Sequence, residues 1–348
     1  MKLKFFKAVL ISAVMATATI VSSCNNSSES VSVYNWGDFL DESLLSDFTA
    51  ETGIAVSYQT YASNEDLFTR LRNNASNYDV AVPSDYTIQR MINEDMLQEI
   101  NFDNIPNYSN IAERFKSLPY DPEAKYSVPY MWGTVGILYN TTMVDDPVES
   151  FDILWDEKYR GQIFMYDSMR DSLGVSLKRL GYSWNSKNID ELNHARDELI
   201  KQKPLVQAYF GDPVKDKMIG NEGALAIVYS GDAMYAMSLN EDLAFALPRE
   251  GSNLWYDSMV IPKGAENKEA AEKFINFMND PEIALQNSEY IGYSSTNLAA
   301  VALMPEETTN NFVYWPSEEL IEGFEVSIDL GDFLSEYDRA WTEVLTSN

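Results

Sequence analysis

Short apolar runs alternate with amphipathic helical segments along most of the chain, and this alternation restricts the possible folds more than any other feature. Residues 31–34 alternate between apolar and polar side chains, as a half-buried strand does. Leu44 and Phe48 then recur at helical spacing until Gly53, which predicts the end of a helix. Strands that alternate with helices in this way are typical of α/β architecture with largely parallel sheets.

The length of the chain indicates more than one lobe. A chain of 348 residues exceeds the size at which one hydrophobic core keeps growing, so we expect two lobes. Residues 130–136 contain small side chains that suit a chain crossing from one lobe to the other.

The alternation of strands and helices continues towards the C-terminus. Further strands are expected over residues 54–58, 78–83, 161–166, 205–210, 224–229, 243–247 and 255–261, and further helices over 64–73, 88–96, 173–180, 190–201, 268–278 and 332–345.

The first 24 residues predict that the protein is exported. Lysines precede an apolar run over residues 8–21, and small residues follow, so we interpret residues 1–23 as a signal peptide. The stretch ends in Cys24 and resembles a bacterial lipobox, in which the cysteine carries the lipid and becomes the mature N-terminus. We therefore expect lipidation of Cys24, a flexible leash over residues 24–30, and an extracytoplasmic protein anchored to the cell membrane, in a periplasm or at the cell surface.

The formal net charge of −29 narrows the choice of partners. A chain this acidic would not bind nucleic acid through its phosphates, and anionic lipid headgroups would repel it. It would attract cations instead. Removal of residues 1–23 takes away lysines and no acids, which makes the mature chain more acidic still.

Cysteine and histidine usage excludes the commoner kinds of hydrolase and metal site. Cys24 is the only cysteine and His194 the only histidine, so the chain has no intrachain disulfide, cysteine metal cluster, catalytic triad with histidine or histidine-rich zinc site. His194 lies in a polar, helix-like stretch and is expected on a helix surface. We expect neither a cofactor nor a bound metal ion. Glycoside hydrolysis by two carboxylates is not excluded on these grounds.

Aromatic and acidic residues recur together where the expected strands end, which is where open α/β sheets bind ligands. Asp85 and Asp232 each precede a helix-like run, which favours a role as a helix N-cap for both. Together, however, the groups predict a site with aromatic faces and several carboxylates, as an organic ammonium cation requires. The groups are Trp36 with Asp38, Asp85 with Tyr86, Asp167 with Asp171, Tyr229 with Asp232, and Trp255 with Asp257.

Motifs spread along the chain match those of one family, in order and with similar spacing. They are YNW at 34–36, ETGI at 51–54, SNE at 63–65, DVAVPS at 79–84, VPYMWG at 128–133, LGYS at 180–183, PREG at 248–251, WYDS at 255–258, NKEA at 267–270, IGY at 291–293 and NLAA at 297–300. On these motifs the chain resembles the extracytoplasmic spermidine/putrescine-binding proteins of bacterial ABC transporters. The resemblance covers essentially all of the mature chain.

The resemblance implies a two-lobed, periplasmic-binding-protein-like fold of type II, with the ligand cleft between the lobes. Each lobe would be a mostly parallel sheet flanked by helices. We expect residues 31–135 and 262–305 to form lobe 1, and residues 136–261 and 306–348 to form lobe 2. The implied partners are a polyamine, putrescine or spermidine, and the membrane permease of an ABC importer. We expect a monomer that is not an enzyme.

The resemblance also assigns ligand contacts to single residues. Asp257 corresponds to the carboxylate that holds an amine, and Ser84 to a strand-end serine near the ligand. The aromatic box of the family corresponds to Trp36, Tyr86, Trp255 and Tyr293.

Four positions depart from the family pattern. Tyr229 stands where family members usually have tryptophan, which weakens cation–π attraction somewhat. Spermidine-type members have an acid pair where this chain has Ser168 and Asp171, so one carboxylate is lost and the other shortened. Ser327 lies where a glutamine is often found.

Two other acids could compensate for the lost carboxylate. Asp38 and Asp232 match positions where putrescine-preferring members carry aspartates. This pattern favours putrescine slightly over spermidine as the ligand.

Other functions are compatible with parts of the pattern. A solute-binding protein of the same fold could take a sugar, because sugar sites also use tryptophan and aspartate, or a ferric ion held by paired tyrosines. A phosphorylated solute would require glycine-rich helix starts and arginines, which the candidate loops lack. A secreted glycosidase and a sensor or adhesion lipoprotein are further alternatives.

Overall fold

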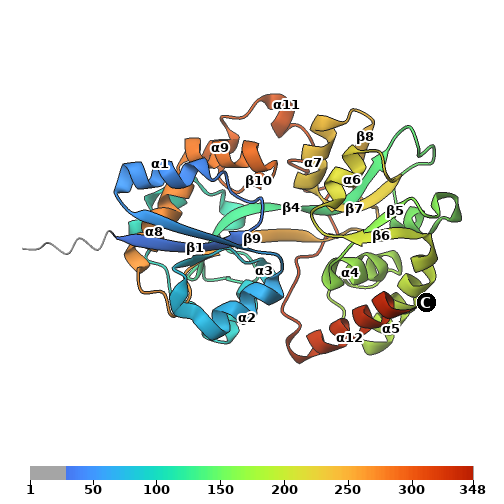
Figure 1. The fold of residues 1–348 in the computed structure, drawn as a ribbon, viewed down its shortest axis with the longest axis horizontal. Coiled ribbons are helices and arrows are strands. Elements are labelled where there is room, and N and C mark those ends of the chain that lie inside the picture. Colours follow the sequence, from blue (N-terminus) through green and yellow to red (C-terminus); the bar gives the residue numbers. More distant parts are fainter. Residues whose placement is uncertain (1–28, 348) are drawn as a thin grey trace, which may run out of the picture.

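The computed structural model describes residues 29–347. The predicted signal peptide, the lipidation site at Cys24 and most of the predicted leash lie outside the described residues. Figure 1 shows two α/β lobes side by side, with the long strand β4 (Ser127–Asn140) and the strand β9 (Leu254–Val260) running between them. The predicted two-lobed α/β architecture is therefore confirmed.

Lobe 1 is built on parallel strands. β1 (Ser30–Trp36) pairs in parallel with β2 (Ala55–Tyr61) on one side and with the short β3 (Val80–Ala81) on the other. The short strand β10 (Ser294–Ser295) pairs with β4. The helices of this lobe are α1 (Ser43–Thr52), α2 (Asn64–Asn74), α3 (Asp85–Asn93), α8 (Lys268–Met278), α9 (Pro281–Ile291) and α10 (Leu298–Val301).

Lobe 2 repeats the arrangement. β5 (Ile163–Tyr166) pairs in parallel with β6 (Val206–Phe210) and with β7 (Leu225–Tyr229). The antiparallel strand β8 (Leu243–Ala246) pairs with β4. The helices are α4 (Met169–Arg179), α5 (Ile189–Gln202), α6 (Val214–Ile219), α7 (Ser230–Leu239) and α12 (Leu334–Thr346), and α11 (Glu306–Thr309) lies in the connection that precedes α12.

Short 3-10 helices supplement these elements. They cover Ala75–Asn77, Phe102–Asn104, Pro106–Asn110, Glu113–Phe115, Phe151–Trp155, Glu157–Tyr159, Lys203–Leu205 and Gly331–Phe333. Among residues 29–347, no helix is both long enough and apolar enough to cross a membrane.

The sheet is parallel in its outer parts and antiparallel in its centre, so the expectation of mostly parallel lobes holds only for the outer strands. Residues 127–134 of β4 pair with β9, and residues 135–140 pair with β7 and β8, all antiparallel. β9 also pairs antiparallel with β3. The centre is antiparallel because two strands cross between the lobes in opposite directions.

Two segments pair differently from the predicted lobe boundaries. The predicted boundary at residue 261 assigns β9 to lobe 2, but its backbone bonds to β3 and the first half of β4 in lobe 1. The segment after residue 306 was also expected in lobe 2. Its Tyr314 instead shares a hydrogen bond of 2.8 Å with Ser288 of α9, and Trp315 packs on Trp132. Tyr314 is buried and Trp315 is partly buried against lobe 1.

The helix α1 shows how local sequence fixes an element. Leu44 and Phe48 are buried one turn apart, and Gly53 follows with a φ of 74°, in the left-handed region that glycine adopts easily. The Gly53 N–H donates to the carbonyl of Thr49 at 2.9 Å, which confirms the predicted helix end.

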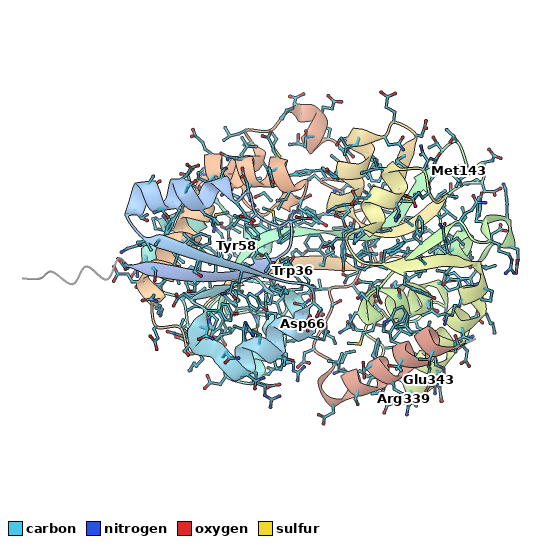
Figure 2. The ribbon with its side chains drawn as sticks, viewed as in Figure 1. Trp36, Tyr58, Asp66, Met143, Arg339 and Glu343 are labelled. Atoms are coloured by element: carbon cyan, nitrogen blue, oxygen red, sulfur yellow. The ribbon has the colours of Figure 1, made fainter. Side chains whose placement is uncertain are left out.

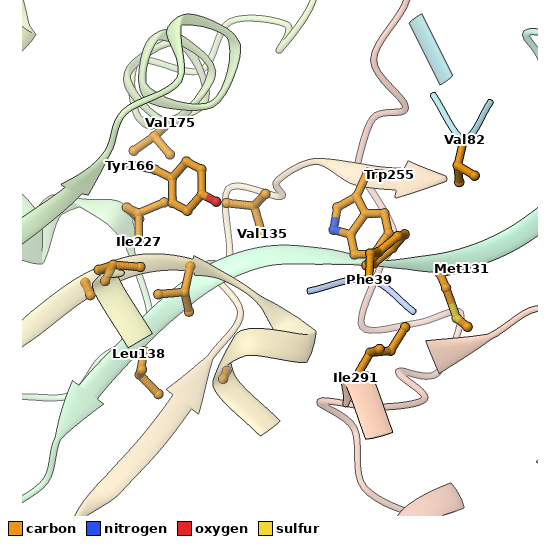
Figure 3. Packing of buried hydrophobic residues seen from close by; sticks show 14 of the residues in the cluster. Phe39, Val82, Met131, Val135, Leu138, Tyr166, Val175, Ile227, Trp255 and Ile291 are labelled. Atoms are coloured by element: carbon orange, nitrogen blue, oxygen red, sulfur yellow. The ribbon is translucent and has the colours of Figure 1, made fainter. Parts of the chain in front are cut away.

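One hydrophobic cluster continues from lobe to lobe. Figure 3 shows it passing along β4, from Val175 and Ile227 in lobe 2 to Met131 and Val82 in lobe 1. Trp255 lies near the middle of this series, at the crossing. The lobes are therefore joined by a packed core as well as by backbone.

Phe48→Ala should destabilise lobe 1 strongly. Phe48 is fully buried, and its ring lies 5.3 Å from that of Phe274 and 5.4 Å from that of Phe277 on α8. We expect urea unfolding to show a loss of about 3–5 kcal/mol in the free energy of unfolding, because the truncation leaves a cavity. The exposed residue Leu303 gives the control, since Leu303→Ala should change this value by about 0.5 kcal/mol or less. Equal effects of the two substitutions would contradict the role of Phe48.

Candidate functional site

A cavity of about 950 Å³ opens between the lobes, where the chain passes from one to the other. Figure 2 shows Trp36 near the middle of the molecule, where the lobes meet. The cavity brings together every residue predicted for the site, although their ligand-binding roles stay predictions. These residues are Trp36, Asp38, Ser84, Asp85, Tyr86, Asp167, Ser168, Asp171, Tyr229, Asp232, Trp255, Asp257, Tyr293 and Ser327.

Successive ring contacts form an aromatic row across the cavity, defined here as Tyr166, Tyr229, Trp255, Tyr293 and Phe39. The ring centroids are 4.9, 5.8, 5.4 and 5.2 Å apart in that order, and each pair meets edge to face. The row starts on β5 and β7 in lobe 2, crosses on β9 and ends in lobe 1. It therefore provides a continuous apolar wall from one lobe to the other.

Trp36 and Tyr86, which we expected in the aromatic box, also line the cavity, but they contact residues outside the aromatic row. The Trp36 ring lies 4.6 Å from that of Tyr61. The guanidinium of Arg170 lies 5.1 Å from the centre of the Tyr86 ring, and the Tyr86 hydroxyl donates to Glu65 at 3.3 Å. Tyr86 therefore contributes to a contact between α3 and α4, from opposite lobes.

Asp257 presents an uncompensated carboxylate to the cavity. It lies on β9 and is buried, and burial raises its pKa to about 7, against a smaller lowering effect of the Ser84 hydroxyl. Within the described part of the chain, its Oδ1 is buried without a hydrogen-bond partner. A buried carboxylate oxygen of this kind is costly unless a cation or donor reaches it.

Asp85 lies next to this carboxylate at the start of α3. Ser84, not Asp85, holds the N-cap position, so the predicted capping role is wrong. The Asp85 carboxylate accepts from the N–H groups of Tyr86 at 2.7 Å and Tyr256 at 3.3 Å. Despite these hydrogen bonds, burial and the negative charge of Asp257 raise the pKa of Asp85 well above its ordinary value.

A second acidic position lies at the start of α4. Ser168 is the N-cap, and its hydroxyl accepts from the N–H of Asp171 at 3.3 Å. The Tyr229 hydroxyl donates to the Asp171 carboxylate at 2.8 Å, while burial raises the pKa of Asp171. Asp171 is thus linked by a hydrogen bond to Tyr229, a member of the aromatic row. Asp167 is exposed at the rim of the cavity.

A third acidic position lies at the start of α7. Tyr229 holds the N-cap position, so a capping role for Asp232 is wrong. Asp232 is buried, which raises its pKa to about 6, although the nearby Lys215 ammonium lowers it. Its Oδ2 is buried with no partner among residues 29–347. Gly231 lets the Tyr293 ring lie against this helix start, because any Cβ there would collide with the ring.

The cavity also contains cations that the sequence analysis missed. Arg170, on α4, is buried and donates to Asn185 at 2.8 Å and to the carbonyl of Ile328 at 3.1 Å. Lys215 lies on α6, a helix of six residues that no apolar periodicity marked. A charged residue in an amphipathic or short helix is usually solvated, so neither carried a sequence signal. Asp338 and Trp341 of α12 also line the cavity.

Within residues 29–347, no three His, Cys, Asp or Glu side chains are grouped so that they could hold a metal ion. The acids described above instead lie at three positions, at the start of α3 beside β9, at the start of α4 and at the start of α7. This spacing suits several points of contact along an extended molecule.

Comparison with known proteins decides the family. A family described as bacterial extracellular solute-binding protein matches residues 43–312. The chain belongs to this family. A curated relative, the spermidine/putrescine-binding periplasmic protein of Escherichia coli (strain K12), is 36% identical over 313 residues, which cover 89% of this chain and 90% of the relative.

Solved structures of solute-binding proteins have the same fold. A protein described as a putative spermidine/putrescine ABC transporter from Listeria monocytogenes is 41% identical, with a TM-score of 0.89 over 92% of this chain and 100% of that one. The spermidine/putrescine substrate-binding protein PotD of Streptococcus pneumoniae is also 41% identical, with a TM-score of 0.81 over 92% and 99% of the two chains.

Family membership confirms that this solute-binding protein serves transport and is not an enzyme. It also agrees with the predicted location outside the cytoplasm, since the family is extracellular. The resemblance drawn from the sequence motifs is confirmed by the same matches. The secreted glycosidase considered above is thereby ruled out.

Asp257→Asn should reduce the loss of stability at higher pH. The folded-state pKa of Asp257, about 7, exceeds its ordinary value of 3.8. Its contribution to stability is therefore complete below the lower value and is lost as the pH rises through 7. Between about pH 5 and pH 8, the variant should lose about 2 kcal/mol less free energy of unfolding than the wild type, as measured by urea titration. The exposed Asp47 provides the control D47N, which should follow the wild type. Parallel pH profiles for D257N and the wild type would show that the burial of Asp257 has no such cost.

Proposed function

We propose that this solute-binding protein captures a polyamine, putrescine or spermidine, and delivers it to the membrane permease of an ABC importer. The observation that carries the proposal is the interlobe cavity, in which several buried carboxylates, among them Asp257 with no basic neighbour, lie beside an aromatic row. The names of its relatives in Escherichia coli and Streptococcus pneumoniae support the same ligand class.

Charge selects for a cation. Among the described residues, ten acidic side chains line the cavity and only two basic ones, Arg170 and Lys215. Asp257 has no basic side chain among the causes of its shifted pKa. An alkylammonium group would donate hydrogen bonds to this carboxylate and offset the free-energy cost of burying its charge.

The aromatic row suits the hydrocarbon part of a polyamine. Methylene groups can pack on the edges and faces of Trp255 and Tyr293, and these rings also offer negative faces to the ammonium groups. A neutral sugar would find similar rings, but it would leave the carboxylate of Asp257 without a counter-charge. A sugar is therefore the weaker candidate.

Putrescine is the preferred polyamine in this proposal. The acid lost at Ser168 removes one contact for a longer ligand, and the remaining Asp171 is already engaged by the Tyr229 hydroxyl. Asp38 and Asp232 also line the cavity, at positions where putrescine-preferring members of the family carry aspartates, and Lys215 lies near both. Spermidine is the alternative.

Closure of the lobes would complete the site. We place the hinges in the crossings β4 and β9, because these strands carry the backbone from one lobe to the other. The lipid anchor proposed at Cys24 would hold a monomeric domain near its permease, with the leash over residues 24–30 giving it reach.

Titration calorimetry of the domain with putrescine and spermidine tests the proposal. Asp257→Asn should weaken putrescine binding by at least about tenfold, equivalent to about 1.4 kcal/mol, because the ammonium loses its charged acceptor. The D47N variant should bind as the wild type does, and maltose should produce no heat of binding. Binding of maltose without binding of either polyamine would overturn the proposed ligand class.

The affinity for putrescine should fall as the pH is lowered. The ligand amines stay protonated well above neutral pH, whereas Asp257 takes up a proton near pH 7 and Asp232 near pH 6. We expect the dissociation constant to rise about tenfold or more from pH 8 to pH 6. In D257N the rise should be smaller, and an identical rise would assign it to other groups.

A further inference from the structure

A lysine of the protein itself lies between two of the carboxylates that face the cavity. The Nζ of Lys215 is 3.7 Å from Oδ1 of Asp232 and 3.9 Å from Oδ2 of Asp38. Lys215 and Asp232 belong to α6 and α7 in lobe 2, whereas Asp38 follows β1 in lobe 1. The ammonium group therefore lies between carboxylates of the two lobes, at the lining of the cavity.

This lysine is held as a cation in a largely enclosed place. Its side chain is 18% exposed, compared with 5% for Asp232 and 83% for Asp38. Burial lowers the pKa of Lys215, but the surrounding carboxylates outweigh it and raise the pKa overall. These carboxylates, from every element around the ammonium, are Asp232, Asp212, Asp38 and Asp216.

The geometry leaves an acceptor open beside the ammonium. Neither distance from Lys215 is within hydrogen-bonding range, so the lysine balances charge without occupying the carboxylate oxygens. In the described residues, Oδ2 of Asp232 has no partner. A ligand ammonium that approached Asp232 would meet a like charge less than 4 Å from the same carboxylate.

A purely structural tie between the lobes explains the arrangement less well. Asp38 is mostly exposed, and an exposed ion pair at 3.9 Å adds little to stability. Asp38 also adopts a φ of 50°, a left-handed conformation that aspartate tolerates and that recurs at functional sites. The charges are arranged around the cavity, not at a packed lobe contact.

We propose that Lys215 is a specificity-determining residue. Its ammonium supplies, from the protein, a positive charge that Asp38 and Asp232 would otherwise take from the ligand. This part of the cavity therefore disfavours an additional ammonium group, and the cleft selects a diamine over a triamine. The inference rests on the proposed polyamine function and identifies the reason for its preference.

Calorimetric titration of full-length mature protein with putrescine and spermidine tests the role of Lys215. The variants K215M and K215Q remove the charge, and K215M also keeps most of the side-chain length. In both, the ratio of the putrescine dissociation constant to that of spermidine should rise at least tenfold, because a third ligand ammonium can then pair with Asp232 and Asp38. K215R, which retains the charge, should keep the wild-type ratio.

Lys217 provides a matched control on the same helix. Its Nζ pairs with Glu222 at 3.0 Å, away from the residues that line the cavity. K217Q should leave the ratio unchanged, and thermal unfolding of each variant would verify that it is folded. An unchanged ratio in both K215M and K215Q, or equal weakening of both polyamines, would overturn the inference. Failure of the wild type to bind either polyamine would instead overturn the proposed function on which it rests.

Discussion

The burial of carboxylates between two lobes is the constraint on which the rest of the structure depends. Asp257, Asp171 and Asp232 are removed from water, and burial raises the pKa of each. A fold accepts such groups only where hydrogen bonds or a cation can compensate them. Tyr229 compensates Asp171 and Lys215 partly compensates Asp232, while Asp257 depends most on what enters the cavity.

The crossing strands make this arrangement possible. β4 and β9 carry the backbone from lobe to lobe, and Trp255 and Asp257 lie on β9 itself. The aromatic row follows the same path, so the apolar wall is fixed by the sheet while acids from both lobes surround it. A site of this kind suits a long, thin cation.

Much of the fold could be predicted from the sequence because its signals are local. Leu44 and Phe48 with Gly53 define α1, and the predicted helix over residues 268–278 coincides with α8. The helix α7 was indicated only as a helix-like run after Asp232, without bounds, because its sequence SGDAMYAMSL has apolar residues on all sides. The antiparallel centre of the sheet was also missed, since strand direction depends on which distant strands become neighbours.

The sequence by itself determined the chemistry of the site: its acids and aromatic residues stand at strand ends, and their resemblance to one family marks them. Only the tertiary structure decided which of them act together. It joined Tyr229 to Asp171 and placed Lys215, on a helix without a periodic pattern, between Asp38 and Asp232. The physical reason is that periodicity and capping act over a few residues, whereas Coulomb interactions and burial depend on distances between segments far apart in the chain.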